Sequence, residues 1–194
     1  MSEFQLYLKL GIDHIADFLS FDHILFIVSL CVVYPLKQWK KILILVTAFT
    51  IGHSLTLALA TLRLITVETA LIEFLIPATI FVTASGNLFQ KSDNFNSKLH
   101  NFKYLAALFF GLIHGMGFSN YLSSLLGKVG NLIIPLFAFN IGIELGQLMI
   151  IISIITLSVL FIDISGTKRR EWVLVWSGGA LGVATVLMIQ RWIW

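Results

Sequence analysis

The sequence predicts an all-α membrane protein, a polytopic bundle of about six transmembrane helices. Of its 194 residues, 58% are hydrophobic and only 12% are charged, whereas soluble domains are about half apolar and about a quarter charged. The mean hydropathy is +0.93. Apolar runs long enough to cross a hydrocarbon core, about 20 residues each, recur along the chain. We therefore expect one membrane-embedded domain over residues 1–194.

The first elements are a short lead-in and a first span. Residues 1–15 mix aromatic and aliphatic side chains with Lys9, and we predict a short interfacial segment at headgroup depth. The apolar run that follows predicts a first span over residues 18–36, which stops at Pro35 because proline cannot continue a helix interior.

Five further apolar runs follow, and each predicts one span. Their ranges are 41–62, 67–90, 103–125, 132–162 and 171–190. The run over 132–162 is longer than a bilayer needs and contains Pro135, Gly142 and Gly146. Tilt or local unwinding of this span is therefore expected.

The basic residues between the runs predict the orientation. Nine of them follow the first, third and fifth spans: Lys37, Lys40, Lys41, Lys91, Lys98, Lys103, Lys168, Arg169 and Arg170. Four lie on the other side: Lys9, Arg63, Lys128 and Arg191. The positive-inside rule places the nine in the cytoplasm and both termini outside. The net charge of +3 thus reflects orientation, and we expect no nucleic-acid partner.

Polar and ionisable residues from five different spans share the outer half of the predicted membrane. They are Asp22, His23, His53, Glu73, His114, Asn140 and Glu144. Such groups near hydrocarbon are costly, and they mostly face a protein interior or a wet cavity. Any one of them could simply bond a neighbouring helix. Their common depth favours a shared polar cavity with a functional role.

Local sequence supports close helix packing around this cavity. Gly111 and Gly115 form a small-xxx-small face beside His114, which lets another backbone approach closely. Asn140, Glu144 and Gln147 share one face of their helix. The same span places the hydroxyls of Thr47, Thr50 and Ser54 near the face of His53, and we expect them to be able to hydrogen-bond its imidazole.

Several short motifs resemble the HupE/UreJ family of small bacterial membrane proteins. They are Gly11-x-x-His14-Ile15, Asp22-His23-Ile-Leu-Phe26, Thr47-Ala-Phe-Thr-Ile-Gly-His53-Ser-Leu-Thr56, Phe110-Gly-Leu-Ile-His114-Gly-x-Gly-Phe118 and Phe139-Asn-x-Gly-Ile-Glu144. The resemblance implies a multi-pass protein of the bacterial inner membrane, associated with nickel uptake. It implies metal-site roles for His14, Asp22, His23, His53, His114 and Glu144. The gap between His14 and Asp22-His23 is longer than the family's usual one, and no His-rich tail is present.

Imidazole and carboxylate groups together suit divalent transition metals such as nickel, cobalt, zinc or copper. Our first hypothesis is a permease, not an enzyme, that holds such an ion at the six residues just named. Glu73, Asn140 and Gln147 would support that site. An intramembrane metal-dependent hydrolase is the alternative, because three histidines and an acid can hold a zinc-bound water. A third hypothesis is a subunit that works only together with protein partners. The expected partners of the permease are the metal ion, as substrate, and the lipid bilayer.

Overall fold

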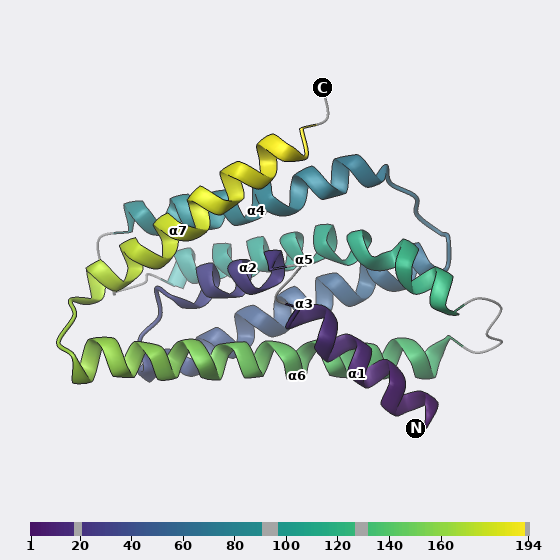
Figure 1. Cartoon of the computed structure of the whole chain (residues 1–194), viewed down its shortest axis with the longest axis horizontal. Helices are drawn as coiled ribbons and strands as arrows, with labels where there is room; N and C mark the ends of the chain where they lie inside the picture. The colour runs from purple at the N-terminus through teal and green to yellow at the C-terminus, as the bar shows by residue number, and fades with distance from the viewer. Residues whose placement is uncertain (18–20, 91–96, 127–131, 193–194) are drawn as a thin grey trace.

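The computed structural model describes residues 1–17, 21–90, 97–126 and 132–192, without the side chains of 97–100, 120, 121 and 123–126. In this part of the chain every regular element is helical (Figure 1). The order is α1 (Glu3–Ile15), α2 (Asp22–Cys31), the 3-10 turn η1 (Leu36–Gln38), α3 (Trp39–Thr61), α4 (Thr69–Phe89), α5 (Ser97–Leu126), α6 (Ile133–Ser158), the π-helical turn η2 (Val159–Ile164) and α7 (Arg169–Gln190).

Five helical segments are long and apolar enough to cross a membrane. They are Leu36–Thr61, Thr69–Phe89, Asn101–Ser119, Ile133–Ile164 and Arg169–Gln190. They correspond to the second to sixth predicted spans. The predicted all-α, multi-pass membrane architecture is therefore confirmed.

The prediction of one unbroken first span over residues 18–36 is wrong. The helix there, α2, has 10 residues, about 15 Å of length, which is half of a hydrocarbon core. The preceding helix α1 is more than a lead-in, because it packs along α6 and buries Tyr7, Gly11 and Ile15. Its polar residues Lys9 and Asp13 form an ion pair one turn apart. They lowered the hydropathy of a segment that nevertheless packs against the bundle.

The helices run between two ends of the bundle. We call the end with the N-terminus and the connection Leu62–Glu68 the N-terminal face. The end with the connections Val32–Gln38 and Ser165–Lys168 is the far face (Figure 1). Helices α4 and α7 lie along one edge of the bundle, α6 and α1 along the opposite edge, and α2, α3 and α5 lie between them.

Two helix pairs approach each other so closely that glycine is required at the crossing. A Cβ on Gly52 of α3 would lie 2.2 Å from the Leu108 carbonyl oxygen, and one on Gly111 of α5 would lie 2.1 Å from that of Phe49. A Cβ on Gly115 would meet the His53 carbonyl oxygen at 2.2 Å. The predicted small-residue face of α5 is thus confirmed as the α3–α5 contact.

The second close pair is α1 with α6. A Cβ on Gly11 would lie 2.2 Å from the Phe139 carbonyl oxygen, and one on Gly142 would lie 2.2 Å from that of Leu8. Gly142 therefore serves packing. The irregularity expected in the long span lies instead at its other end, in the π-helical turn Val159–Ile164. Pro135 sits near the helix start, where a missing N–H costs little.

A polar seam joins α3 to α6. The hydroxyls of Thr47, Thr50 and Ser54 bond the side chains of Glu144, Gln147 and Asn140 at 2.9, 2.7 and 2.6 Å respectively. The expectation that these hydroxyls bond the imidazole of His53 is wrong, because each faces α6. The face shared by Asn140, Glu144 and Gln147 is this seam.

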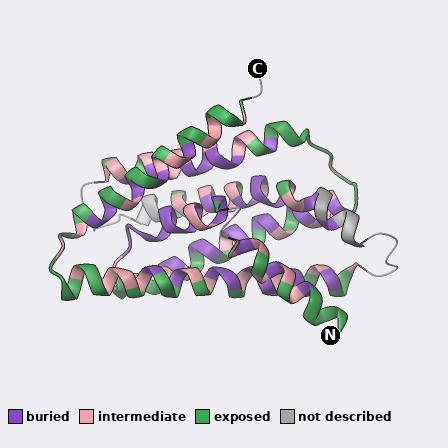
Figure 2. Ribbon diagram, in the orientation of Figure 1, coloured by how far each residue is buried: buried purple, intermediate pink, exposed green. Residues whose placement is uncertain are grey.

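Buried side chains concentrate where these helices meet (Figure 2). The largest fully buried ones include Phe26, Phe49, Phe139 and Ile15, which come from four different helices. Large apolar side chains such as Ile51, Leu105 and Phe137 are exposed on the outside of the bundle. Such a surface fits a protein that meets lipid rather than water.

The α1–α6 crossing predicts that Gly142→Ala destabilises the protein. The added methyl group overlaps the Leu8 carbonyl, and overpacking of this kind costs about 1–3 kcal/mol. Thermal unfolding in detergent should show a lower midpoint for Gly142→Ala. The matched control is Gly182→Ala, because a Cβ there meets no atom within 4 Å. Equal midpoints for the two variants would contradict the close crossing.

Candidate metal site

Four histidines from four helices meet in the middle of the bundle. His14 lies in the last turn of α1, His23 lies in the first turn of α2, His53 lies in α3 and His114 lies in α5. The ring centroid of His23 lies 4.6 Å from that of His14, 6.1 Å from that of His53 and 5.1 Å from that of His114. The imidazoles predicted to converge are therefore neighbours, and we call these four residues the histidine cluster.

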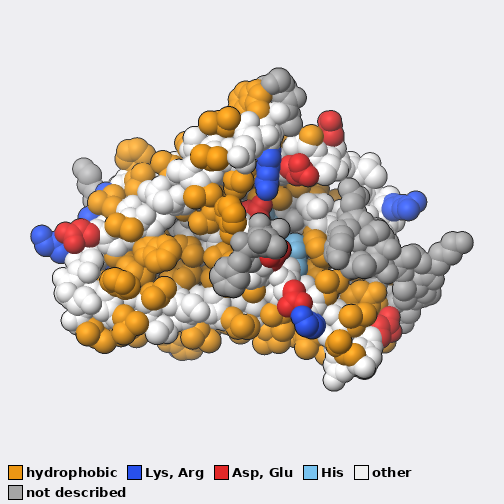
Figure 3. Space-filling view, viewed as in Figure 1, with side chains coloured by type: hydrophobic (Ala, Val, Ile, Leu, Met, Phe, Trp, Pro, Cys, Tyr) orange, Lys and Arg blue, Asp and Glu red, His pale blue; other side chains and the backbone are white. Residues whose placement is uncertain are grey.

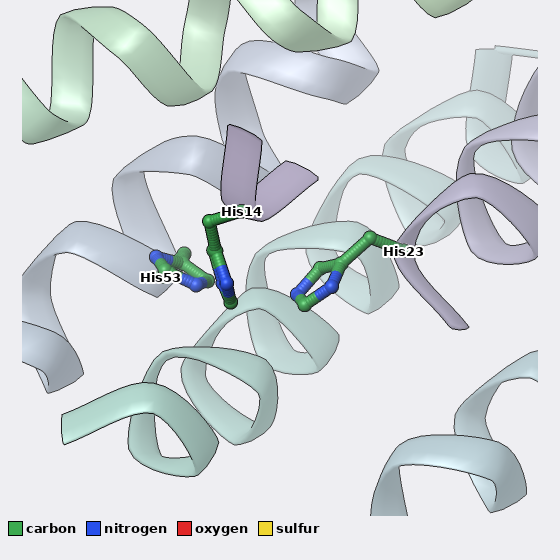
Figure 4. A group of neighbouring side chains, drawn as sticks. All are labelled: His14, His23 and His53. Atoms are coloured by element: carbon green, nitrogen blue, oxygen red, sulfur yellow. The ribbon is translucent and has the colours of Figure 1, made fainter. Parts of the chain in front are cut away.

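Three members of the cluster are close enough to share one ion. His14, His23 and His53 each offer a ring nitrogen within 4.8 Å of those of the other two. Figure 4 shows their rings turned toward a common centre. His53 is 0% exposed and His23 is 6% exposed. This geometry needs only a small adjustment to place three nitrogens at the ~2 Å bonding distance of a metal.

The ring nitrogens of the cluster are left open by the protein. Both nitrogens of His23 and of His53 are buried without a hydrogen-bond partner, as are Nε2 of His14 and Nδ1 of His114. Buried polar atoms are almost always hydrogen-bonded, so an unpartnered set calls for an explanation. Neutral imidazole nitrogens that converge without partners are a ready ligand set for a divalent transition metal.

His114 differs from the other three. Its Nε2 lies 3.0 Å from the hydroxyl oxygen of Thr79 on α4, and it is not among the three nitrogens that lie close together. Thr79 orients its ring, as outer hydrogen bonds orient metal-binding imidazoles. His114 is thus placed as a neighbour of the three-histidine group.

Phenylalanine rings enclose the cluster on two sides. Phe118 stacks on Phe139 at 5.1 Å and lies 3.9 Å from the His14 ring. On the other side, Phe26 and Phe49 lie 5.1 and 5.2 Å from the His114 ring. This apolar wall keeps the local dielectric low, which strengthens any charge interaction within the cluster.

A cavity of about 810 Å³ gives access to the cluster. Its charged lining comprises Asp13, Asp17, Asp22, Glu73 and Arg191, and it also contacts His14, His23 and His114. Figure 3 shows a histidine side chain in a hollow among acidic side chains and a basic one. Of the four carboxylates, Asp13 pairs with Lys9 and Asp22 pairs with Arg191, so the cavity keeps an excess of negative charge that makes it attractive to cations.

Asp22 is held by an ion pair. Its Oδ2 accepts a hydrogen bond from Arg191 at 3.1 Å, and its side chain is 12% exposed. Arg191, just past the end of α7, also donates to the backbone oxygen of Glu73. The pair ties α7 to the first residue of α2, next to His23. Arg191 is a site residue that the sequence did not predict, because it was counted only as a loop charge.

The remaining predicted residues lie around the cluster. Glu73 lines the cavity wall. Glu144, Asn140 and Gln147 belong to the α3–α6 seam, and Glu144 is not part of the close ligand group. Thr47, its partner, precedes His53 by six residues, about 9 Å along α3 toward the far face. Metal ligation by any of the six predicted residues stays a prediction, and His14, His23 and His53 are the three whose ring nitrogens lie close together.

Comparison with known sequences bears on what this site is for. The sequence model of one family, described as HupE / UreJ protein, matches residues 1–193. The resemblance carried by the short motifs is thus confirmed over essentially the whole chain. No curated protein and no solved structure matches the chain.

The histidine cluster predicts metal binding that depends on its imidazoles. His23→Ala and His53→Ala should each weaken Ni²⁺ or Zn²⁺ binding at least tenfold, because even outer-shell changes cost 10- to 100-fold. Titration calorimetry on protein in detergent measures this. Thr61→Ala is the matched control, since Thr61 is a buried polar residue of the same helix as His53. Wild-type affinity in both histidine variants would contradict the site.

The Asp22–Arg191 ion pair predicts that substitutions of its two residues change metal affinity in opposite directions. Arg191→Gln should tighten divalent-metal binding by about two- to tenfold, because it frees a carboxylate and removes a competing positive charge. Asp22→Asn should weaken binding, and Arg191→Lys should stay near wild type. Weaker binding by Arg191→Gln would show instead that Arg191 holds Asp22 in its binding position.

Proposed function

Because the chain belongs to the HupE/UreJ family, we propose that it is a permease for a divalent transition-metal ion. One observation carries the proposal. Three imidazoles from three helices bring their ring nitrogens within 4.8 Å of one another in the interior of a membrane protein. The ion would be the substrate, held in passage by His14, His23 and His53.

The chemistry of the donors favours a transition metal over other cargo. Imidazole binds nickel, cobalt, copper and zinc, whereas magnesium and calcium prefer oxygen ligands. His114 lies beside the three histidines, with its Nδ1 buried and unpartnered. It would give the ion a fourth ligand. Nickel is the metal that the family association favours.

The acidic cavity supports access from the N-terminal face. Asp13, Asp17 and Glu73 lie in the cavity wall and would concentrate a dication before it reaches Asp22 and His23. In the described part of the chain, most basic residues lie at the far face, in its connections or in the adjoining helix ends, such as Lys37, Lys41 and Arg170. The N-terminal face is then external, and both termini lie outside the inner membrane of a bacterium.

The first crossing in this proposal is a broken one. Helix α1 brings the chain from the N-terminal face to the cluster, and α2 continues from the cluster to the far face. Together with five long helices, they make six crossings. Irregular backbone at membrane depth is tolerated where it lines a protein cavity, and half-helix ends at such a break are common in transporter ion sites.

The α3–α6 seam supports onward passage. Glu144 bonds Thr47 on the far-face side of His53, so its carboxylate would next compensate the charge of the ion. Gln147 and Asn140 bond α3 on the same seam and hold α6 in register. We assign Glu144 to this second position on the route.

Uptake into proteoliposomes tests the proposal. Vesicles that contain the protein and an internal metal-sensing dye should take up Ni²⁺, Co²⁺ or Zn²⁺ at least tenfold faster than empty vesicles. His23→Ala and His114→Ala should lose most of this rate, while the control Thr61→Ala keeps it. Mg²⁺ should not enter.

A second readout separates transport from binding alone. Metal bound by the same preparation is measured by elemental analysis. Stoichiometric binding without uptake by wild-type protein would contradict the permease, and so would uptake that survives the loss of His23.

A further inference from the structure

The two glycine crossings repeat each other in detail. A Cβ on Gly11 would meet the Phe139 carbonyl, and one on Gly111 would meet that of Phe49. On the partner helices, Gly142 faces the Leu8 carbonyl and Gly52 faces that of Leu108. Each crossing therefore uses the same contacts, with α1 corresponding to α5 and α6 corresponding to α3.

The sequences at these contacts correspond as well. Leu8-x-x-Gly11-x-x-His14 in α1 matches Leu108-x-x-Gly111-x-x-His114 in α5. Phe49-x-Ile-Gly52 in α3 matches Phe139-x-Ile-Gly142 in α6. Two members of the histidine cluster, His14 and His114, thus occupy equivalent positions.

The corresponding helices run in opposite directions. Helices α1 and α6 run in the direction from the N-terminal face toward the far face, whereas α3 and α5 run in the opposite direction (Figure 1). The remaining long helices, α4 and α7, are also antiparallel and pack on each other. Phe74 contacts Trp192 near one end of this pair, and Asn87 bonds Ser177 toward the other.

We propose that the fold is an inverted repeat, in which α1, α3 and α4 of one half correspond to α5, α6 and α7 of the other, and the short helix α2 is an addition to the first half. The two halves are related by a pseudo-twofold axis in the membrane plane that passes near the histidine cluster. Inverted repeats place substrate sites at the repeat interface, and they support alternating access from the two sides. The repeat thereby identifies the exit route of the proposed permease.

The pseudo-twofold axis relates the access cavity near the N-terminal face to a groove near the far face. The cavity lies between α1 and the end of α7, where Leu10 and Arg191 line it. The equivalent place lies between α5 and the end of α4, and a groove of about 340 Å³ occurs there. Phe110, the counterpart of Leu10, lines this groove together with Gly86 and Asn87.

Aromatic rings close this groove off from the cluster. Phe26 lies 4.9 Å from Phe49 and 5.9 Å from Phe110, measured between ring centroids. Phe26 and Phe49 are 0% and 1% exposed and also pack on His114. The cavity is therefore open to the cluster while the groove is shut. In the opposite state, movement of one half against the other would part Phe110 of α5 from Phe26 of α2 and open the groove.

This inference rests on the proposed function, and filling the groove tests it. Gly86→Trp places an indole in the groove, where a Cβ meets no atom within 4 Å. The variant should bind metal like wild type and lose at least 90% of proteoliposome uptake. The matched control, Gly182→Trp, adds the same side chain at another open, exposed glycine on α7 and should transport normally.

The outcomes separate the two proposals. Absence of uptake by wild-type protein would overturn the permease itself. Uptake by wild type that persists in Gly86→Trp would overturn the exit route and leave the permease standing. Retained binding with lost uptake, in Gly86→Trp alone, supports the route.

A second measurement tests the exit route even if the Gly86→Trp variant fails to fold. In a Cys31→Ala background, which has no other cysteine, Gly86→Cys is labelled with a water-soluble maleimide from the far-face side. Saturating Ni²⁺ should change the labelling rate at least threefold, because bound ion shifts the population of the open groove. The same rate with and without Ni²⁺ would overturn the inference.

Discussion

The close approach of two pairs of helix backbones is the constraint on which the site depends. Gly11 against Gly142 and Gly52 against Gly111 remove the side chains that would keep the helices apart. His14 follows Gly11 by one turn, His53 follows Gly52 directly, and His114 follows Gly111 by one turn. Close crossing therefore carries three imidazoles into the centre of the bundle, where α2 adds His23.

Polar side chains of the interior differ in whether they have hydrogen-bond partners. Along the α3–α6 seam, hydroxyls satisfy the buried amide oxygen of Gln147 and the partly buried one of Asn140, which removes most of the cost of burying them. Within the histidine cluster, ring nitrogens are left without partners. An unsatisfied buried polar atom costs about 1–3 kcal/mol. A fold that leaves several together gains from any ion that binds there, and this links stability to the proposed cargo.

Much of the fold followed from composition and from the spacing of apolar runs. Five spans were predicted within a few residues, and the glycines of α5 were recognised as a helix contact. The packing of α1 against the bundle was not predicted, because Lys9 and Asp13 lower the hydropathy of α1 while they pair with each other. The long span is expected to tilt or unwind because it contains Pro135, Gly142 and Gly146, but its irregular turn lies at Val159–Ile164, since Gly142 serves packing.

The sequence alone determined that this is a helical membrane protein of the HupE/UreJ family, and it predicted that imidazoles from different spans share a common depth. Depth follows from position along a span, so one-dimensional order is enough to predict it. Which residues share a centre depends on how each helix is rotated and crossed, and tertiary packing alone decides that. It grouped His14, His23 and His53, turned Glu144 toward Thr47, and brought Arg191 across the bundle to Asp22. It also revealed a repeat whose matching motifs are too short to be recognised before their contacts are seen.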